Sequence, residues 1–106
     1  MPGQTIDEIE ARIAGSPNLS DENREALLQL LKVLRTEVTE LSATSVEDAR
    51  NITAQAEAAT RPEQNQDVVQ SAIDSLSSTV EKFEGSHPRL TQTVTDICSI
   101  LARMGI

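Results

Sequence analysis

The fold is decided by one stretch near the end of the chain, Phe83-Glu84-Gly85-Ser86-His87-Pro88-Arg89-Leu90. Proline suits the first position of a helix, because the N–H that it lacks would have no partner there, and it disfavours helical backbone in the residue before it. Pro88 therefore predicts a helix that starts here. Beyond it, apolar residues at alternating spacings of four and three mark one stripe of a helix over about 88–104: Leu90, Val94, Ile97, Leu101 and Met104.

The same apolar spacing occurs in two stretches upstream. Ser20 is a typical N-cap, and it precedes a ladder formed by Leu27, Leu31, Leu34, Val38 and Leu41. Pro62 predicts another helix start, and the helix over about 62–84 carries a ladder formed by Val69, Ile73, Leu76, Val80 and Phe83. At the end of the chain, Gly105 and Ile106 are typical of a Schellman stop.

A short helix over about 5–14 is predicted at the beginning of the chain. Thr5 and Glu8 have the spacing of a capping box, and Ile6, Ile9 and Ile13 follow at helical spacing. Gly15-Ser16-Pro17-Asn18 ends this helix. Charged pairs four residues apart, Glu8–Arg12 and Glu57–Arg61, are expected to support the helix surfaces.

Two interpretations compete for residues 20–59. The ladder fades after Leu41, and a displaced stripe of smaller residues takes over at Val46, Ala49, Ile52, Ala56 and Ala59. One long helix to about residue 59 is favoured slightly, because no Gly or Pro occurs between 20 and 60. The alternative is a break at 42–45, with Ser45 as a fresh N-cap.

These elements predict one all-α domain over 1–106, with two long arms folded at 60–62 into an antiparallel hairpin or helical bundle. An uninterrupted helix over 20–59 would be about 60 Å long. With a single aromatic residue, Phe83, the interior is expected to be a thin aliphatic seam, which is marginal in a small chain. A coiled-coil-like edge left over from the hairpin is expected to pair with a second copy, giving a homodimer or higher homo-oligomer: Leu28, Leu30, Ile73, Cys98 and Ile100.

Composition limits the partners and the compartment. The net charge is −8, and the nine basic residues are scattered among seventeen acidic ones, which weighs against binding nucleic acid or an anionic membrane surface. No apolar run approaches the roughly 20 residues that cross a bilayer, and the first residues lack the pattern of a signal peptide. A single cysteine fits a reducing compartment. We expect a cytoplasmic protein.

The Phe83–Pro88 stretch and the ending Leu101-Ala102-Arg103-Met104-Gly105-Ile106 resemble an uncharacterised family of small bacterial proteins, classed as a domain of unknown function. Members of that family are short, acidic, helical chains with a Phe-Glu-Ala-Ser-His-Pro motif and a Gly-Ile ending. Gly85 stands here in place of the alanine. The resemblance extends through the helix of Leu27–Leu41, and it implies a bacterial, cytoplasmic, stand-alone domain without a known activity.

Few residues could carry chemistry. His87, the only histidine, could be a pH-sensitive or ligand-binding group, but a structural role with Ser86 and Pro88 at the helix start is favoured. Cys98 lies eleven residues away, too far for a nucleophile–base pair on one helix, so a small buried hydrophobe is favoured. The acids Glu37, Glu40, Glu47 and Asp48 are expected to form a solvated face and not a metal site.

No catalytic, cofactor-binding or metal residue is therefore predicted, and we do not expect an enzyme. The predicted function is that of a protein–protein interaction module that self-associates and also binds an unknown protein partner. Its assembly residues would be those of the ladders: Leu27, Leu31, Leu34, Val38, Leu41, Val69, Ile73, Leu76, Val80, Phe83, Leu90, Val94, Ile97 and Leu101. One alternative is a regulatory domain that binds a small ligand or metal near His87. Another is an antitoxin-like protein that masks a basic partner.

Overall fold

The computed structural model describes residues 2–16, 19–60 and 66–103, and of residues 2, 3, 66 and 69 it describes the backbone only. These parts of the chain contain helices and no strand, which confirms the all-α prediction. The helices are α1 (Pro2–Ala14), α2 (Asp21–Ser42), α3 (Val46–Ala59), α4 (Gln66–Glu81) and α5 (Pro88–Arg103). None of them combines the length and the apolar character needed to cross a membrane.

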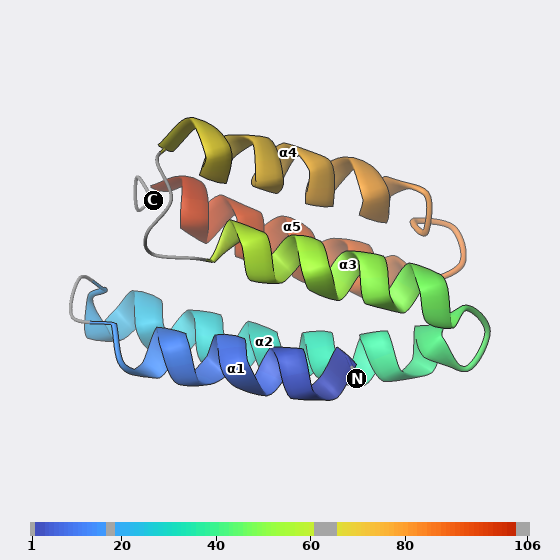
Figure 1. The fold of residues 1–106 in the computed structure, drawn as a ribbon, viewed down its shortest axis with the longest axis horizontal. Coiled ribbons are helices and arrows are strands. Elements are labelled where there is room, and N and C mark those ends of the chain that lie inside the picture. Colours follow the sequence, from blue (N-terminus) through green and yellow to red (C-terminus); the bar gives the residue numbers. More distant parts are fainter. Residues whose placement is uncertain (1, 17–18, 61–65, 104–106) are drawn as a thin grey trace.

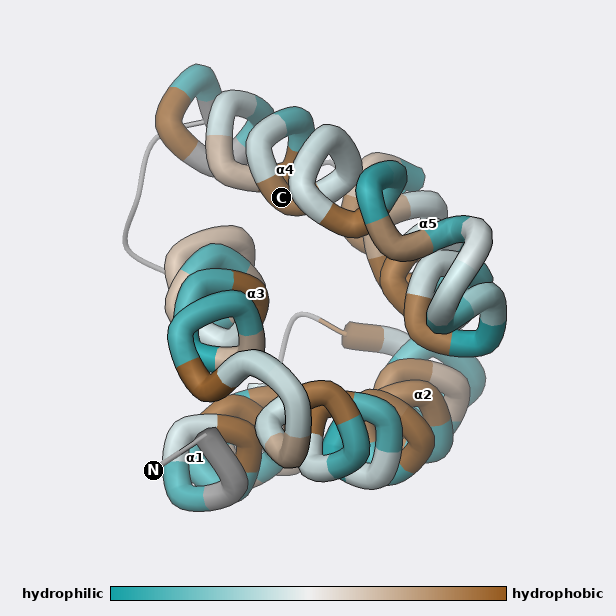
Figure 2. The backbone as a smooth tube through the Cα atoms, turned by 90° about the vertical axis from the view of Figure 1, so that its right-hand side faces the viewer, coloured by the Kyte–Doolittle hydropathy of each residue, from teal (hydrophilic) through white to brown (hydrophobic). Residues whose placement is uncertain are grey.

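The helices form a bundle around one aliphatic interior. Four of them close into a ring, because α2 contacts α3, α3 contacts α4, α4 contacts α5, and α5 contacts α2. α1 lies outside this ring and packs on α2 and α3 (Figure 1). Seen along the helices, the apolar residues of each element are turned mainly toward the middle (Figure 2). The helical-bundle form of the prediction is therefore the one that the structure takes.

The preference for one long helix over 20–59 is wrong, and the alternative break at 42–45 is confirmed. α2 ends at Ser42 and α3 begins at Val46. The hydroxyl oxygen of Ser45 accepts a hydrogen bond from the N–H of Asp48 (3.3 Å), as an N-cap does. The hydroxyl of Thr44 donates to the carbonyl oxygen of Leu41 (3.0 Å), which is one of the groups left over at the end of α2. Polar side chains thus end one helix and start the next without Gly or Pro.

The break changes the shape of the molecule. The longest principal extent is 37 Å, well short of the about 60 Å that an uninterrupted arm would need. With the break, α3 folds back onto α2, so the two predicted long arms become four helices of the ring. The turn at 60–62 is described only to Thr60, whose N–H donates to the carbonyl oxygen of Glu57 (3.2 Å).

Other helix limits differ from the predictions by a few residues. α1 begins at Pro2 and not at Thr5, because proline fits the first turn of a helix. Thr5 therefore lies inside the helix and does not form a capping box with Glu8. α4 ends at Glu81 and not at 84. The residues that follow donate hydrogen bonds to the carbonyl three positions back, as the N–H of Phe83 does to Val80 (2.9 Å), and not four positions back as in an α-helix. The predicted start at Pro62 and the Gly105–Ile106 stop lie outside the described residues.

The ladder residues form the core of a single chain. Twelve of the fourteen predicted assembly residues are buried, Phe83 is half-buried against the core, and the side chain of Val69 lies outside the described part. α1 contributes Ile6, Ile9 and Ile13 to the same core. The buried members of the predicted set are Leu27, Leu31, Leu34, Val38, Leu41, Ile73, Leu76, Val80, Leu90, Val94, Ile97 and Leu101.

The apolar edge that was expected to pair with a second copy is covered within one chain. Ile73, Cys98 and Ile100 are buried, and Leu28 and Leu30 are partly buried against the core. In a two-layer hairpin these side chains would be exposed to solvent. In the ring of four helices they are covered by neighbouring helices. Among the described residues, the exposed large hydrophobic side chains are Val33, Val46 and Val68.

Candidate functional site

The turn between α4 and α5 holds the Ser-His-Pro motif in a network of backbone hydrogen bonds. The N–H of His87 donates to the carbonyl oxygen of Phe83 (2.6 Å). The N–H of Thr91 donates to the His87 carbonyl (3.2 Å), so His87 occupies the N-cap position of α5. The hydroxyl of Thr91 reaches back to the carbonyl oxygen of Val80 at 2.9 Å. The motif therefore connects the end of α4 to the first turn of α5.

The side chain of His87 packs against the only aromatic ring in the chain. The ring centroids of Phe83 and His87 are 6.3 Å apart and the planes meet at 65°, an edge-to-face arrangement. Both side chains are half-buried, whereas Ser86 and Pro88 are exposed. This contact gives His87 a packing role that needs no ligand.

Gly85 is not required by the geometry of this turn. A Cβ atom built at Gly85 meets nothing within 4 Å. Alanine, the residue that the resemblance leads us to expect here, would therefore fit without any displacement. Nothing in the structure of the turn explains why this chain has glycine at position 85.

Replacing His87 with Ala is expected to destabilise the fold by about 0.5–1.5 kcal/mol, the usual value of an edge-to-face ring pair. For a chain of this size, that loss corresponds to a fall in Tm of roughly 2–10 °C in a thermal melt followed by circular dichroism. His87→Phe keeps the ring pair and serves as the control. If the alanine variant melts at the wild-type temperature, the structural role of His87 is wrong.

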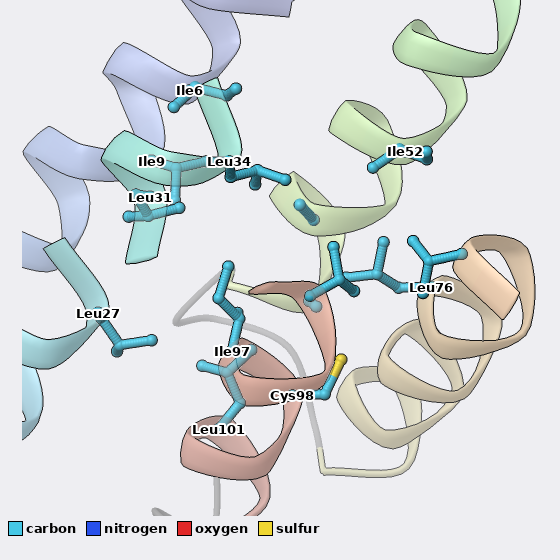
Figure 3. Packing of buried hydrophobic residues seen from close by; sticks show 14 of the residues in the cluster. Ile6, Ile9, Leu27, Leu31, Leu34, Ile52, Leu76, Ile97, Cys98 and Leu101 are labelled. Carbon is cyan, nitrogen blue, oxygen red and sulfur yellow. The ribbon is translucent and has the colours of Figure 1, made fainter. Parts of the chain in front are cut away.

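Cys98 is buried between α5 and α4. Its side chain is 7% exposed, and Sγ lies 3.9 Å from the carbonyl oxygen of Ile73 on α4. Figure 3 shows the sulfur among buried apolar side chains. Burial, and secondly the negative charge of Asp74, raise the pKa of the thiol from 9.0 to about 11. At neutral pH the thiol is protonated, which is the opposite of what a nucleophile requires.

The buried thiol predicts a loss of stability in alkali. The folded state holds the thiol proton more tightly than the unfolded chain, whose thiol has the ordinary pKa of 9.0. Below about pH 9 the stabilisation is complete and amounts to about 2–3 kcal/mol. It is lost as the pH rises from about 9 through about 11. Urea unfolding between about pH 8 and 11 measures it. Cys98→Ala should show a clearly shallower decline, and an equally steep decline would contradict the assignment.

Cys98 and His87 do not form a catalytic pair within the chain. They are eleven residues apart, at the two ends of a stretch that includes most of α5, and this separation corresponds to about 16 Å along a helix. A nucleophile and its base need hydrogen-bond distance. The structure thus keeps apart the two side chains that the sequence singled out for chemistry.

The acids of the central region are spread over two helices and do not converge. Glu40 and Glu47 are exposed and Asp48 is half-buried, whereas Glu37 is buried on α2. No group of three or more His, Cys, Asp or Glu side chains within 2–16, 19–60 and 66–103 is arranged to hold a metal ion. The burial of Glu37 departs from the predicted solvated face. It results from the position of Glu37 on the flank of the Leu34–Leu41 stripe.

α1 occupies a groove between α2 and α3. Its residues Ile6, Ile9 and Ile13 are 0%, 0% and 4% exposed, and the helices within contact distance of α1 are α2 and α3. Figure 3 shows Ile6 and Ile9 beside Leu31 and Leu34 of α2. Isoleucines at i, i+3 and i+7 are the anchors by which an amphipathic helix docks into an apolar groove.

Charged side chains fix α1 on both flanks of this groove. Arg35 of α2 donates to Asp7 and to Glu10 of α1, the latter at 2.5 Å. On the other flank, Arg12 of α1 pairs with Glu57 of α3 (3.5 Å). The groove therefore has a cation on its α2 side and an anion on its α3 side, and α1 carries the matching charges.

Sequence reasoning did not identify this charge pattern. The sequence predicts a pair between Arg12 and Glu8 on the same helix, but Arg12 pairs with Glu57, forty-five residues away. The predicted Glu57–Arg61 pair involves a residue outside the described part. The isoleucine stripe of α1 was visible in the sequence; the helices that it packs against were not.

The comparisons with known proteins give one match. The sequence profile of a protein family described as Domain of unknown function (DUF4404) matches residues 27–106, which contain most of α2 and all of α3, α4 and α5. No curated protein and no solved structure matches the chain significantly. The match covers well over half of the chain, leaves α1 outside, and agrees with the resemblance seen in the Ser-His-Pro stretch. This chain belongs to the DUF4404 family of domains of unknown function.

Proposed function

We propose that this domain is a non-enzymatic protein–protein interaction module that self-associates. The observation that carries the proposal is the way α1 is held. An amphipathic helix, docked by three isoleucines and by ion pairs on both flanks, is a helix-in-groove interaction, and this chain already makes one internally. The apolar and charged residues that bind α1 could also bind an amphipathic helix of the same kind from another chain.

The chemistry of the interior supports a role without catalysis. The core is built from Leu, Ile, Val and Ala side chains. The thiol of Cys98 is buried and protonated, and His87 is engaged with Phe83. General acid–base or nucleophilic catalysis needs reactive groups within hydrogen-bond reach of each other and of a substrate. These two side chains are instead used for packing.

Self-association cannot add a second copy on top of the predicted ladders as they stand. Those residues are already covered by helices of the same chain, so a second copy can reach them only by replacing one of those helices. A masking role for the acidic surface is supported by the net charge of −8 alone. The groove filled by α1 remains the best candidate interface.

Sedimentation and light scattering of the full chain, from about 1 μM to 1 mM, test the proposal. We expect the average mass to rise with concentration toward that of two chains. The mass of one chain over the whole range would overturn self-association. A thermal-shift screen against metals and metabolites tests the rival ligand-binding function. A stabilisation of several degrees that is lost in His87→Ala would favour that rival.

A further inference from the structure

α1 is an addition to a ring that closes without it. Among the helices that the structure describes, contacts join α2 to α3, α3 to α4, α4 to α5 and α5 to α2, whereas α1 contacts only α2 and α3. Figure 2 shows α1 at one corner, outside the loop made by the other four helices. The family match begins at residue 27, after α1 has ended. Two independent observations thus separate α1 from the rest of the domain.

The groove is complementary to the sequence of α1, and a second copy carries the same sequence. Ile6, Ile9 and Ile13 fill its apolar floor. Arg35 on one flank pairs with two acids of the docked helix, and Glu57 on the other pairs with its Arg12. An α1 helix from another chain would make each of these contacts unchanged. Exchange of an identical element between protomers is a low-cost route to a dimer for this reason.

Arg24 bonds to residues of the connection between α1 and α2, on which such an exchange depends. One of its terminal nitrogens donates to the carbonyl oxygens of Ser16 (2.7 Å) and Leu19 (3.1 Å). The other pairs with Asp21 at 2.7 Å. The two carbonyls belong to the six residues, 15–20, that join α1 to α2 and include Pro17. Arg24 therefore ties Ser16 and Leu19 to the first turns of α2.

We propose that the protein self-associates by exchanging α1, so that the α2–α3 groove of each copy receives α1 of the other, and that Arg24 is the latch that favours the unexchanged form. This inference rests on the proposed function, which requires only self-association by some surface. The dimer gains no new groove contacts. Its population is set by how strongly the connection is held closed and by the protein concentration.

The test uses the full chain carrying Arg35→Lys, which keeps the cation beside Asp7 and Glu10 and adds an amine. Chains with natural isotopes and chains labelled with ¹⁵N are mixed, concentrated and treated with a carbodiimide, which joins Lys amines to carboxylates in contact. The dimer fraction is then digested and analysed by mass spectrometry. In exchanged dimers, about half of the crosslinks between position 35 and residues 7 or 10 should join a heavy chain to a light one, as random pairing requires.

A second variant tests the latch. Arg24→Ala should raise the association constant of the dimer about ten-fold, because the closed connection loses its charge-assisted hydrogen bonds. Arg89→Ala, which removes an exposed arginine at the start of α5, is the matched control and should leave the constant unchanged. An unchanged constant in Arg24→Ala would overturn the role of Arg24.

The possible failures are distinguishable. A dimer whose crosslinks at position 35 are all within one isotope would refute the exchange of α1 and leave the proposed function standing, with another surface as the interface. A single-chain mass at every concentration would refute both. Mixed-isotope crosslinks in the dimer fraction would support both.

Discussion

Replacing Leu34 with Asp is expected to leave the chain largely unfolded at 25 °C. Leu34 is 0% exposed and lies beside Ile9 where α1 meets α2 (Figure 3). The substitution removes a large buried side chain and places a carboxylate in an apolar interior. We expect a loss of at least about 5 kcal/mol, which is comparable to the whole stability of a small domain. Far-UV circular dichroism and urea unfolding measure it.

The neighbouring residue provides the matched control. Val33 is on the same helix but is 37% exposed, so Val33→Asp adds the same charge to a solvated position. This variant should lose less than about 1 kcal/mol. If the two variants were equally stable, the α2 stripe would not be the core of the molecule, and the arrangement of the ring would be wrong. The comparison removes the effect of adding a charge to the helix from the result.

The helices and their starting points were predictable where a local rule decides them. α5 begins at Pro88 as expected, because proline acts on its own residue and the one before it. Ser20 caps α2, its hydroxyl accepting from the N–H of Asn23 at 3.1 Å. Both signals depend on interactions within about one turn of helix. A sequence displays such interactions directly.

The break at 42–45 was harder to predict because two local signals were in conflict. The absence of Gly and Pro favoured one helix, whereas the displaced apolar stripe and the serine favoured two. Packing decides between them: on one continuous helix, Ala49 and Ile52 would point the same way as Leu31 and Leu34, so the two stripes could not cover each other. With a break, both stripes face one interior. Burial of apolar surface outweighs the few backbone hydrogen bonds lost at the turn, two of which Ser45 and Thr44 replace.

Contacts between distant helices could not be predicted from periodicity. The stripes identify which side of each helix is buried, but several arrangements bury the same sides. Arg35 pairs with acids of α1, and Arg12 with Glu57 of α3, only because α1 returns to the groove between α2 and α3. The same ambiguity produced the expected dimer edge. A ring of helices covers Ile73 and Ile100, and a two-layer hairpin would leave them exposed.

α3 differs from the other helices of the ring in the size of its buried side chains. Its buried residues are Ala49, Ile52, Thr53, Ala56 and Ala59, whereas those of α2 and α5 include several Leu, Ile and Val residues. Small side chains allow neighbouring helices to approach closely, and α3 contacts three of them, α1, α2 and α4. Ile52 is the one large apolar side chain that α3 contributes to the core (Figure 3). The attachment of α3 should therefore depend strongly on Ile52.

Replacing Ile52 with Ala is expected to destabilise the fold by about 3–4 kcal/mol, toward the upper part of the range for such truncations. Ile52 is 0% exposed, and the alanines around it have no atoms with which to fill the space. The loss is measured as the shift in the urea midpoint relative to the wild-type chain, provided that the m value is unchanged. Ile52→Val removes one methylene group and should lose about 1 kcal/mol. If Ile52→Ala loses no more than Ile52→Val, the neighbouring helices can close the cavity, and Ile52 is not the residue that holds α3 in the ring.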